Sequence, residues 1–268
     1  MRKSLLSLAV LSTFAVPALS FADEAAPVVA PAAEAAPASP IAYNVGLYSQ
    51  YIFRGLTQTA NKPAIQGGVD YTNANGFYLG TWASNVSWLG DAASANPTTG
   101  YKNSSLELDL YGGYRGAIKD VSYDVGLLQY VYPGTPNSNQ FRAETTEVYG
   151  ALTYKWVTAK LSVAVSDKVF GTVNAGGTYY GDITANYPVT DTITATAHVG
   201  RQDYSGSGND KYSYTDWKIG ASKAFANGVT VGAYYTDTNA KVSAYGPTVY
   251  SGGNIADAQG TIYVQKTF

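Results

Sequence analysis

The fold is decided by the stretch Leu106-Glu107-Leu108-Asp109-Leu110-Tyr111-Gly112-Gly113-Tyr114-Arg115. One parity of this stretch carries apolar or aromatic side chains, namely Leu106, Leu108, Leu110 and Tyr114. The other parity carries charged or hydroxyl-bearing side chains, namely Glu107, Asp109, Tyr111 and Arg115. Because successive side chains of a β-strand point to opposite faces, the stretch predicts a strand with one apolar face and one strongly polar face.

The same two-residue period recurs on both sides of this stretch and predicts twelve strands. Their expected bounds are 42–54, 63–73, 76–88, 104–116, 120–132, 142–154, 158–169, 176–187, 191–204, 212–225, 228–239 and 256–268. Short turns such as 73–76 follow every second strand, and longer polar loops such as 89–103 and 240–255 follow the others. Transmembrane barrels alternate tight periplasmic turns with longer outer loops in this way. We therefore predict an all-β, antiparallel, up-and-down transmembrane barrel of about twelve strands.

The chain before the first strand has the pattern of an export signal and a linker. In residues 1–22, Arg2 and Lys3 precede an apolar run, and Ala22 ends a small-residue cleavage pattern, as in a secretory signal peptide. Residues 23–40 are rich in Ala and Pro and predict a disordered linker, which leaves 41–268 for the barrel. An even number of strands places both ends of the barrel on the periplasmic side. The terminal Phe268 resembles the sorting signal that the barrel-assembly machinery binds.

Composition excludes several classes of protein. The chain has 17 Lys+Arg against 19 Asp+Glu, so it lacks the basic excess of a nucleic-acid-binding protein. It has no cysteine, which rules out a disulfide framework and a thiolate metal site. Its 24 Tyr suit a protein that contacts both apolar and wet surroundings. We expect outer-membrane lipid as its surroundings, no cofactor and no nucleic acid.

A soluble β-sandwich or a lipocalin-like barrel would also alternate, with its apolar face turned inward. The polar face of this chain holds too many charges for a dry core. They are Glu107, Asp109, Arg115, Asp124, Glu147, Lys160, Asp182, Asp216 and Lys218. This distribution favours a membrane barrel, whose interior is polar and whose outer face is apolar.

Three nearby segments resemble a known family. They are Tyr51-Ile52-Phe53-Arg54-Gly55-Leu56-Thr57-Gln58-Thr59, Lys62-Pro63-Ala64-Ile65-Gln66-Gly67-Gly68-Val69-Asp70-Tyr71 and Gly76-Phe77-Tyr78-Leu79-Gly80-Thr81-Trp82-Ala83-Ser84-Asn85. They are similar to the TorF-like porin family, long catalogued as bacterial proteins of unknown function. The rest of the chain is similar in size, strand rhythm and C-terminus only. The resemblance implies an outer-membrane barrel and a transport role, and it brings no functional residues with it.

The residues of this region predict a first hairpin followed by another strand. Arg54 and Asp70 then lie at the polar face of neighbouring strands, so we expect an Arg–carboxylate pair across the lumen wall. The pair is interpreted either as a scaffold contact or as a selectivity element of a channel. Gly55 suits a strand end that needs an unusual backbone angle.

The residues do not predict an enzyme. His198 is the only histidine and by parity faces the lumen among threonines, whereas a hydrolase of the Ser–His type needs its histidine beside a nucleophile. The sequence has no phosphate-binding loop, zinc spacing or EF-hand. Asp91 and Asp257 lack the spacing of a calcium loop. We therefore expect no catalytic site and no metal site.

The pattern predicts a porin-like channel for passive diffusion of small hydrophilic solutes or ions through a narrow lumen of mixed charge. The candidate pore-lining residues are Arg54, Asp70, Glu107, Asp109, Arg115, Asp216 and Lys218. A second class stays open, a non-conducting barrel that acts in adhesion, envelope organisation or surface binding through its outer loops. The bulky polar-face residues Tyr111, Tyr149, Tyr180 and Tyr263 favour it by filling the lumen. A monomer is expected, since no lipid-facing patch stands out as an interface.

Overall fold

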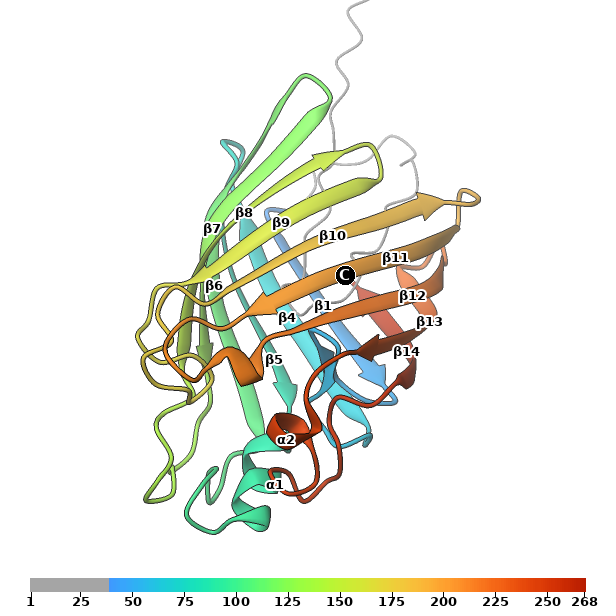
Figure 1. Cartoon of the computed structure of the whole chain (residues 1–268). Helices are drawn as coiled ribbons and strands as arrows, with labels where there is room; N and C mark the ends of the chain where they lie inside the picture. Colours follow the sequence, from blue (N-terminus) through green and yellow to red (C-terminus); the bar gives the residue numbers. More distant parts are fainter. Residues whose placement is uncertain (1–38) are drawn as a thin grey trace, which may run out of the picture.

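The computed structural model describes residues 39–268. The predicted signal peptide 1–22 and all but the last two residues of the predicted linker 23–40 lie outside the described residues. Twelve long strands close into an antiparallel barrel (Figure 1). They are β1 (Ile41–Tyr48), β4 (Ala64–Thr72), β5 (Phe77–Asn85), β6 (Leu106–Ile118), β7 (Val121–Val131), β8 (Thr145–Tyr154), β9 (Val157–Ala164), β10 (Tyr179–Pro188), β11 (Ile193–Asp203), β12 (Tyr214–Ala224), β13 (Val229–Thr238) and β14 (Gln259–Thr267). β1 pairs with β4 on one side and with β14 on the other, which closes the ring.

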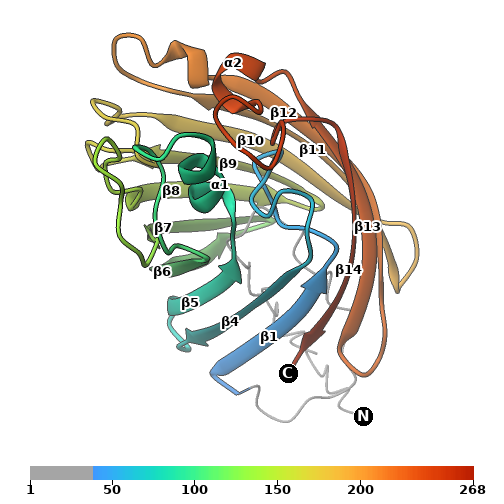
Figure 2. The same cartoon turned by 90° about the horizontal axis from the view of Figure 1, so that it is seen from below.

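The predicted barrel is therefore confirmed, and every predicted strand has its counterpart. Two strands end well before their expected limits. The strand expected over 158–169 ends at Ala164, and the first strand, expected over 42–54, ends at Tyr48. The chain then leaves the wall and forms a small hairpin of β2 (Ile52–Phe53) and β3 (Leu56–Thr57). Seen along the barrel, this blue segment lies inside the ring of strands (Figure 2). We call residues 49–63 the strap.

The tip of the strap is a tight turn at Arg54 and Gly55. Both residues have positive φ, 48° and 79°, a region that only glycine enters without strain. The turn also lies close to β12 and β13: a Cβ at Gly55 would be 2.5 Å from Cγ2 of Thr238 and 2.7 Å from Cβ of Asp216. The strap therefore extends from the β1–β4 side of the barrel to β12 and β13.

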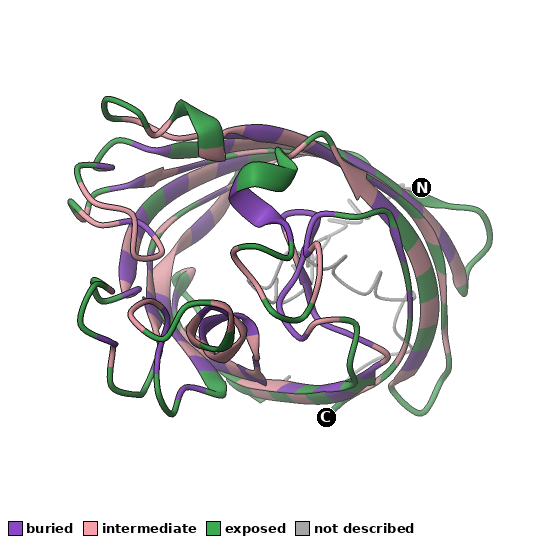
Figure 3. Cartoon of the chain, turned by 60° about the horizontal axis from the view of Figure 1, so that its bottom comes forward, coloured by how far each residue is buried: buried purple, intermediate pink, exposed green. Residues whose placement is uncertain are grey.

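The two faces of the wall differ as predicted. Leu106 and Leu110 of β6 are exposed on the outside, whereas Glu107 and Asp109 between them are buried inside. The strands are accordingly striped with buried and exposed residues (Figure 3). An apolar outer band around a polar interior is the pattern of a barrel in lipid. Within the described part of the chain, no helix combines the length and the apolar character needed to span a membrane.

Tyrosine and glycine pair across strands in the interior. Tyr149 of β8 lies opposite Gly126 of β7. A Cβ at Gly126 would be 2.3 Å from the hydroxyl oxygen of Tyr149 and 2.7 Å from the carbonyl oxygen of Gly112. The hydroxyl of Tyr149 contacts that of Tyr78 on β5. Rings thus lie across the inner wall where the neighbouring residue has no side chain, which gives the many Tyr and Gly residues a common structural role.

The long connections gather at one end of the barrel (Figure 1). They carry α1 (Trp88–Ala95), the short 3₁₀ helix η1 (Asp210–Tyr212) and α2 (Val242–Tyr245). The two longest loops contact each other, since the backbone N–H of Ser251 donates to the carbonyl of Asp91 at 3.1 Å. The loop end is thus partly covered by packed loops, whereas the opposite end has only tight turns.

Candidate functional site

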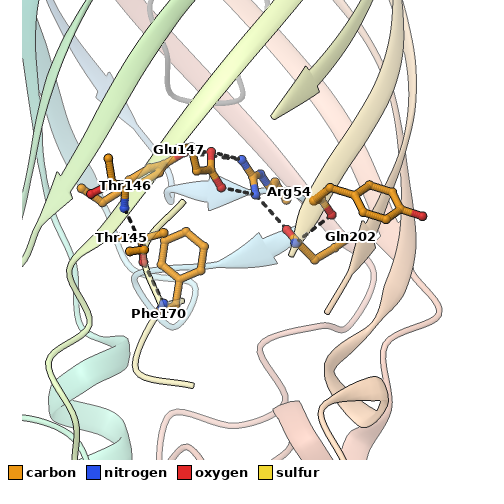
Figure 4. Close-up of polar contacts among 9 residues, drawn as sticks. Arg54, Thr145, Thr146, Glu147, Phe170 and Gln202 are labelled. Atoms are coloured by element: carbon orange, nitrogen blue, oxygen red, sulfur yellow. Dashed lines mark hydrogen bonds and ion pairs between the residues drawn. The ribbon is translucent and has the colours of Figure 1, made fainter. Parts of the chain in front are cut away.

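Arg54, at the tip of the strap, is bound to the opposite wall. Its guanidinium donates to both carboxylate oxygens of Glu147 on β8, at 2.8 and 3.1 Å, and to Oε1 of Gln202 on β11 at 2.8 Å (Figure 4). The guanidinium carbon also lies 4.4 Å from the ring centroid of Tyr180 on β10. A two-point Arg–carboxylate contact fixes orientation as well as distance, so the strap is held at three strands, β8, β10 and β11.

The ion pair is enclosed by the protein. Arg54 is 4% exposed and Glu147 is 2% exposed. Burial by itself would lower the pKa of Arg54, but the adjacent Glu147 carboxylate raises it well above its ordinary value, so the guanidinium stays charged. The ring of Phe53 stacks edge-on against Tyr130 and Phe170, at centroid distances of 5.7 and 5.6 Å. Aromatic packing therefore shields the pair on the side of the loops.

The expected pairing of Arg54 with Asp70 is wrong. That pairing assumed that strand β1 continues to Arg54, and the chain instead turns inward after Tyr48. Asp70 on β4 is buried in the interior and accepts a hydrogen bond from the hydroxyl of Tyr111 on β6 at 2.8 Å. Arg54 lies on the other side of the lumen, beside Glu147. Glu147 was recognised on the polar face from the sequence, but its partner was not.

Two further candidates, Glu107 and Asp109, lie on β6 where the strap enters. Both are almost fully buried. Glu107 accepts a hydrogen bond from the hydroxyl of Tyr51 in the strap at 2.6 Å. Burial raises the pKa of that phenol and the Glu107 carboxylate raises it further, so Tyr51 remains the donor. Asp109 differs, since neither of its carboxylate oxygens has a hydrogen-bond partner among residues 39–268.

The remaining candidates form two groups. Arg115 on β6 donates from Nε to Asp124 on β7 at 3.0 Å, and its guanidinium carbon lies 3.8 Å from the ring centroid of Tyr78. Asp216 on β12 contacts the hydroxyl of Tyr180 at 3.0 Å and Nε2 of His198 at 3.1 Å. Lys218, the next inward residue on β12, lies 5.3 Å from the ring centroid of Tyr234.

All seven candidates thus lie inside the barrel, and all are buried. They do not form one ring around the lumen. Arg54, Glu107, Asp109 and Asp216 lie at the strap, and the others are distributed along the wall. Sequence reasoning missed Gln202 and the place of Tyr180 beside the guanidinium. Parity alone would have marked both as inward, but only the course of the strap brings them to Arg54.

An aromatic chamber of about 290 Å³ opens between the strap and the loops. Its walls include Tyr132, Tyr204, Tyr212, Tyr214, Tyr245 and Tyr250, together with the amide of Gln202. Burial raises the pKa of Tyr204, Tyr245 and Tyr250, so their hydroxyls stay protonated. Gln202 belongs both to this chamber and to the Arg54 contact, so the chamber lies directly against the strap.

No cluster of three His, Cys, Asp or Glu side chains with metal-binding geometry occurs in the described part of the chain. His198 faces the interior, as predicted, with Nδ1 2.7 Å from the hydroxyl of Thr184.

Comparisons with known proteins agree with this architecture. A family model described as "Bacterial protein of unknown function (Gcw_chp)" matches residues 32–268. Among solved structures, the chain is similar to a KdgM porin, at 9% identity and a TM-score of 0.50, over 85% of this chain and 98% of that one. It is similar to a NanC porin at 10% identity, with the same TM-score and coverage. No curated protein sequence matches the chain. At these identities the likeness shows the fold, which is that of outer-membrane porins.

Proposed function

This chain belongs to the Gcw_chp family of bacterial proteins of unknown function, and we propose that it is an outer-membrane channel. Small hydrophilic solutes or ions would cross it by passive diffusion through a lumen narrowed by the strap. The observation that carries the proposal is the Arg54–Glu147 contact in the barrel interior. A charged segment fixed across a polar lumen narrows the path and sets a local field, the two quantities that determine passage through a pore.

In this proposal the solute path is lined at the strap by Arg54, Glu107, Asp109 and Asp216. Asp70, Arg115 and Lys218 line the wall elsewhere. Their present burial means that solutes pass close to side chains and strap, as in a narrow pore, and not through a wide water column. The finer assignment to the TorF-like porins is part of the same proposal.

The proposal includes an orientation and a setting. The tight turns face the periplasm together with both ends of the barrel, and the packed loops face outward, as in other transmembrane barrels. The exposed apolar band contacts lipid, the assembly machinery binds the strand that ends in Phe268, and the protein acts as a monomer and not as an enzyme.

One observation favours a second function, a non-conducting barrel that binds a ligand at its outer end. The strap, the inward tyrosines and the packed loops fill much of the lumen, and the aromatic chamber opens on the loop side. Such a chamber, apolar with a few polar groups, has the character of a small-molecule site.

Liposome swelling separates the two functions. Purified, refolded protein is incorporated into vesicles, and the swelling rate is measured with uncharged sugars of increasing size. The channel proposal predicts uptake of the smallest sugars and a sharp size cut-off, and Arg54→Gln raises the cut-off because it frees the strap. The matched control is Arg201→Gln, which removes an exposed arginine paired with Asp203. Folded protein that admits no sugar, with or without Arg54, contradicts the channel proposal.

A further inference from the structure

The aromatic chamber is lined by two groups of rings. One group is a continuous chain of tyrosines, with successive ring centroids 5.6, 6.3 and 5.5 Å apart: Tyr204, Tyr212, Tyr245 and Tyr214. The other group includes Trp88 and Tyr132, whose ring centroids are 5.4 Å apart. Tyr250 packs against both of the buried clusters to which these groups belong. The chamber therefore offers aromatic surface from several sides to a flat ligand.

The size of the chamber suits a compound of one or two rings. Its volume of about 290 Å³ is roughly twice that of an apolar cavity that holds benzene, about 150 Å³. Its lining includes Lys211, an exposed residue of the short helix η1. A ligand can therefore reach the chamber from the loop end, past Lys211.

The charge of the lining is positive. Of the described residues that line the chamber, Lys211 alone has a charged side chain, and none is Asp or Glu. Lys211 has no carboxylate partner among residues 39–268, because the neighbouring Asp210 lies 3.8 Å from Nζ of Lys241 instead. Nζ of Lys211 lies 4.9 Å from the ring centroid of Tyr212, beside the chain of tyrosines. A cation without a partner at the mouth of a cavity attracts an anionic ligand.

Three phenol groups of the lining have an unused proton. The hydroxyls of Tyr204, Tyr212 and Tyr250 have no hydrogen-bond partner in the described part of the chain. Burial raises the pKa of Tyr204 and Tyr250, so their hydroxyls stay protonated and can donate. The amide oxygens of Gln140 and Gln202 already accept hydrogen bonds from the protein. The chamber therefore suits a ligand with hydrogen-bond acceptors, and a carboxylate supplies two acceptor oxygens together with the negative charge.

We infer that the aromatic chamber binds a small aromatic carboxylate, with its ring against the tyrosine and tryptophan rings and its carboxylate toward Lys211 and the free tyrosine hydroxyls. The inference rests on the second proposed function, a ligand site at the outer end, and names the ligand class of that site. Binding itself does not require conduction. Because Gln202 belongs to both the chamber and the Arg54 contact, a bound ligand lies next to the strap.

The first test is equilibrium dialysis of benzoate and of its neutral analogue benzamide against the refolded full-length protein in a non-ionic detergent, with protein-free micelles as the reference. We expect saturable binding of one benzoate per chain, several-fold tighter than that of benzamide. Lys211→Gln should raise the Kd of benzoate about three- to fivefold, the value of an exposed ion pair, and leave that of benzamide unchanged. The matched control is Lys102→Gln, an exposed lysine outside the lining. Equal affinity for the two compounds, a Kd of benzoate that Lys211→Gln does not alter, or no saturable binding overturns the inference.

The second test removes hydroxyls and keeps rings. The double variant Tyr204→Phe with Tyr250→Phe should raise the Kd of benzoate about tenfold, because it removes two donors to a charged acceptor. The matched control is Tyr154→Phe, an exposed tyrosine of β8, which should leave the Kd unchanged. An unchanged Kd in the double variant overturns the inferred contact with the carboxylate.

The same preparations distinguish this inference from the channel proposal. Protein that conducts in a planar bilayer and binds no benzoate keeps the channel and loses the ligand site. Protein that binds benzoate with the expected dependence on Lys211 and does not conduct loses the channel and keeps the ligand site.

Discussion

Arg54 and Glu147 are 93 positions apart in the sequence and form two hydrogen bonds to each other, at 2.8 and 3.1 Å, inside the barrel. The pair joins the tip of the strap to β8. It is supported by the amide of Gln202 and the ring of Tyr180. Among the contacts of Arg54, the buried ion pair with Glu147 therefore contributes most to holding the strap in place.

We predict that Arg54→Gln lowers the free energy of unfolding by about 3–5 kcal/mol, because it leaves the Glu147 carboxylate buried without its partner. The double variant Arg54→Gln with Glu147→Gln should recover most of that loss. Denaturant unfolding in detergent micelles measures both. The exposed pair of Arg201 and Asp203 supplies the control, and Arg201→Gln should cost about 0–1 kcal/mol. A double variant no more stable than Arg54→Gln would mean that the pair is not what holds the strap.

The tip of the strap should tolerate no side chain at Gly55. Gly55→Ala combines a positive φ of 79° with two contacts below 3 Å to side chains of β12 and β13, and we expect it to displace the tip and change the single-channel conductance. Gly208→Ala is the matched control, since Gly208 has a φ of 78° and no neighbouring atom within 4 Å of a new Cβ. It should show only the backbone cost, about 1 kcal/mol. Equal conductance in the two variants would contradict the contact between tip and wall.

The Tyr–Gly pairing predicts a difference between two strand glycines. Gly126→Ala on β7 places a methyl group against the Tyr149 hydroxyl and a backbone carbonyl, and should destabilise the barrel by about 1–3 kcal/mol through overpacking. Gly150→Ala on β8 meets nothing within 4 Å and should be neutral or slightly stabilising. Heat-modifiable mobility on a gel, followed over temperature, compares the two. Similar midpoint temperatures of unfolding for the two variants would show that the Tyr149 ring moves away from the new methyl group without loss of stability.

On the lipid-facing surface, the loss of stability caused by a charged substitution should depend on the depth of the residue in the bilayer. Leu127 in β7 and Ile118 at the end of β6 are both exposed on the outside. We predict that Leu127→Arg costs about 2–4 kcal/mol and that Ile118→Arg, next to the turn, costs about 0–1 kcal/mol. Folding into vesicles of defined thickness, titrated with urea, gives the two values. If the costs were equal, the apolar band would not be the membrane-spanning surface.

The barrel was predictable because its signal is local. Along β6 the alternation of Leu and charged residues specifies which face each side chain takes, whatever partners it later meets. The alternating loop lengths added an independent indication of strand number. Both features depend on neighbours in the sequence, and the structure confirms them.

The strap was not predictable by the same means. Residues 49–54 continue the pattern of the first strand, so the two-residue alternation by itself predicts that this strand runs to Arg54. What turns the chain inward is a set of partners far along the sequence, Glu147, Gln202 and Asp216, and a positive φ at Arg54 that its residue type rarely adopts. For the same reason the inward-facing position of Asp70 was predicted correctly and its partner was not. The partner, Tyr111, lies two strands away and donates a hydrogen bond to Asp70.

The most direct test of the channel proposal is the single-channel conductance of the refolded protein in a planar bilayer. It is compared with the conductance of the variant that carries both Arg54→Gln and Arg115→Gln. We predict steady small openings for the parent, and larger openings with altered ion selectivity for the variant. Silence from both proteins, when each is folded and heat-modifiable on a gel, would contradict the channel and leave a closed barrel that works through the aromatic chamber at its loop end.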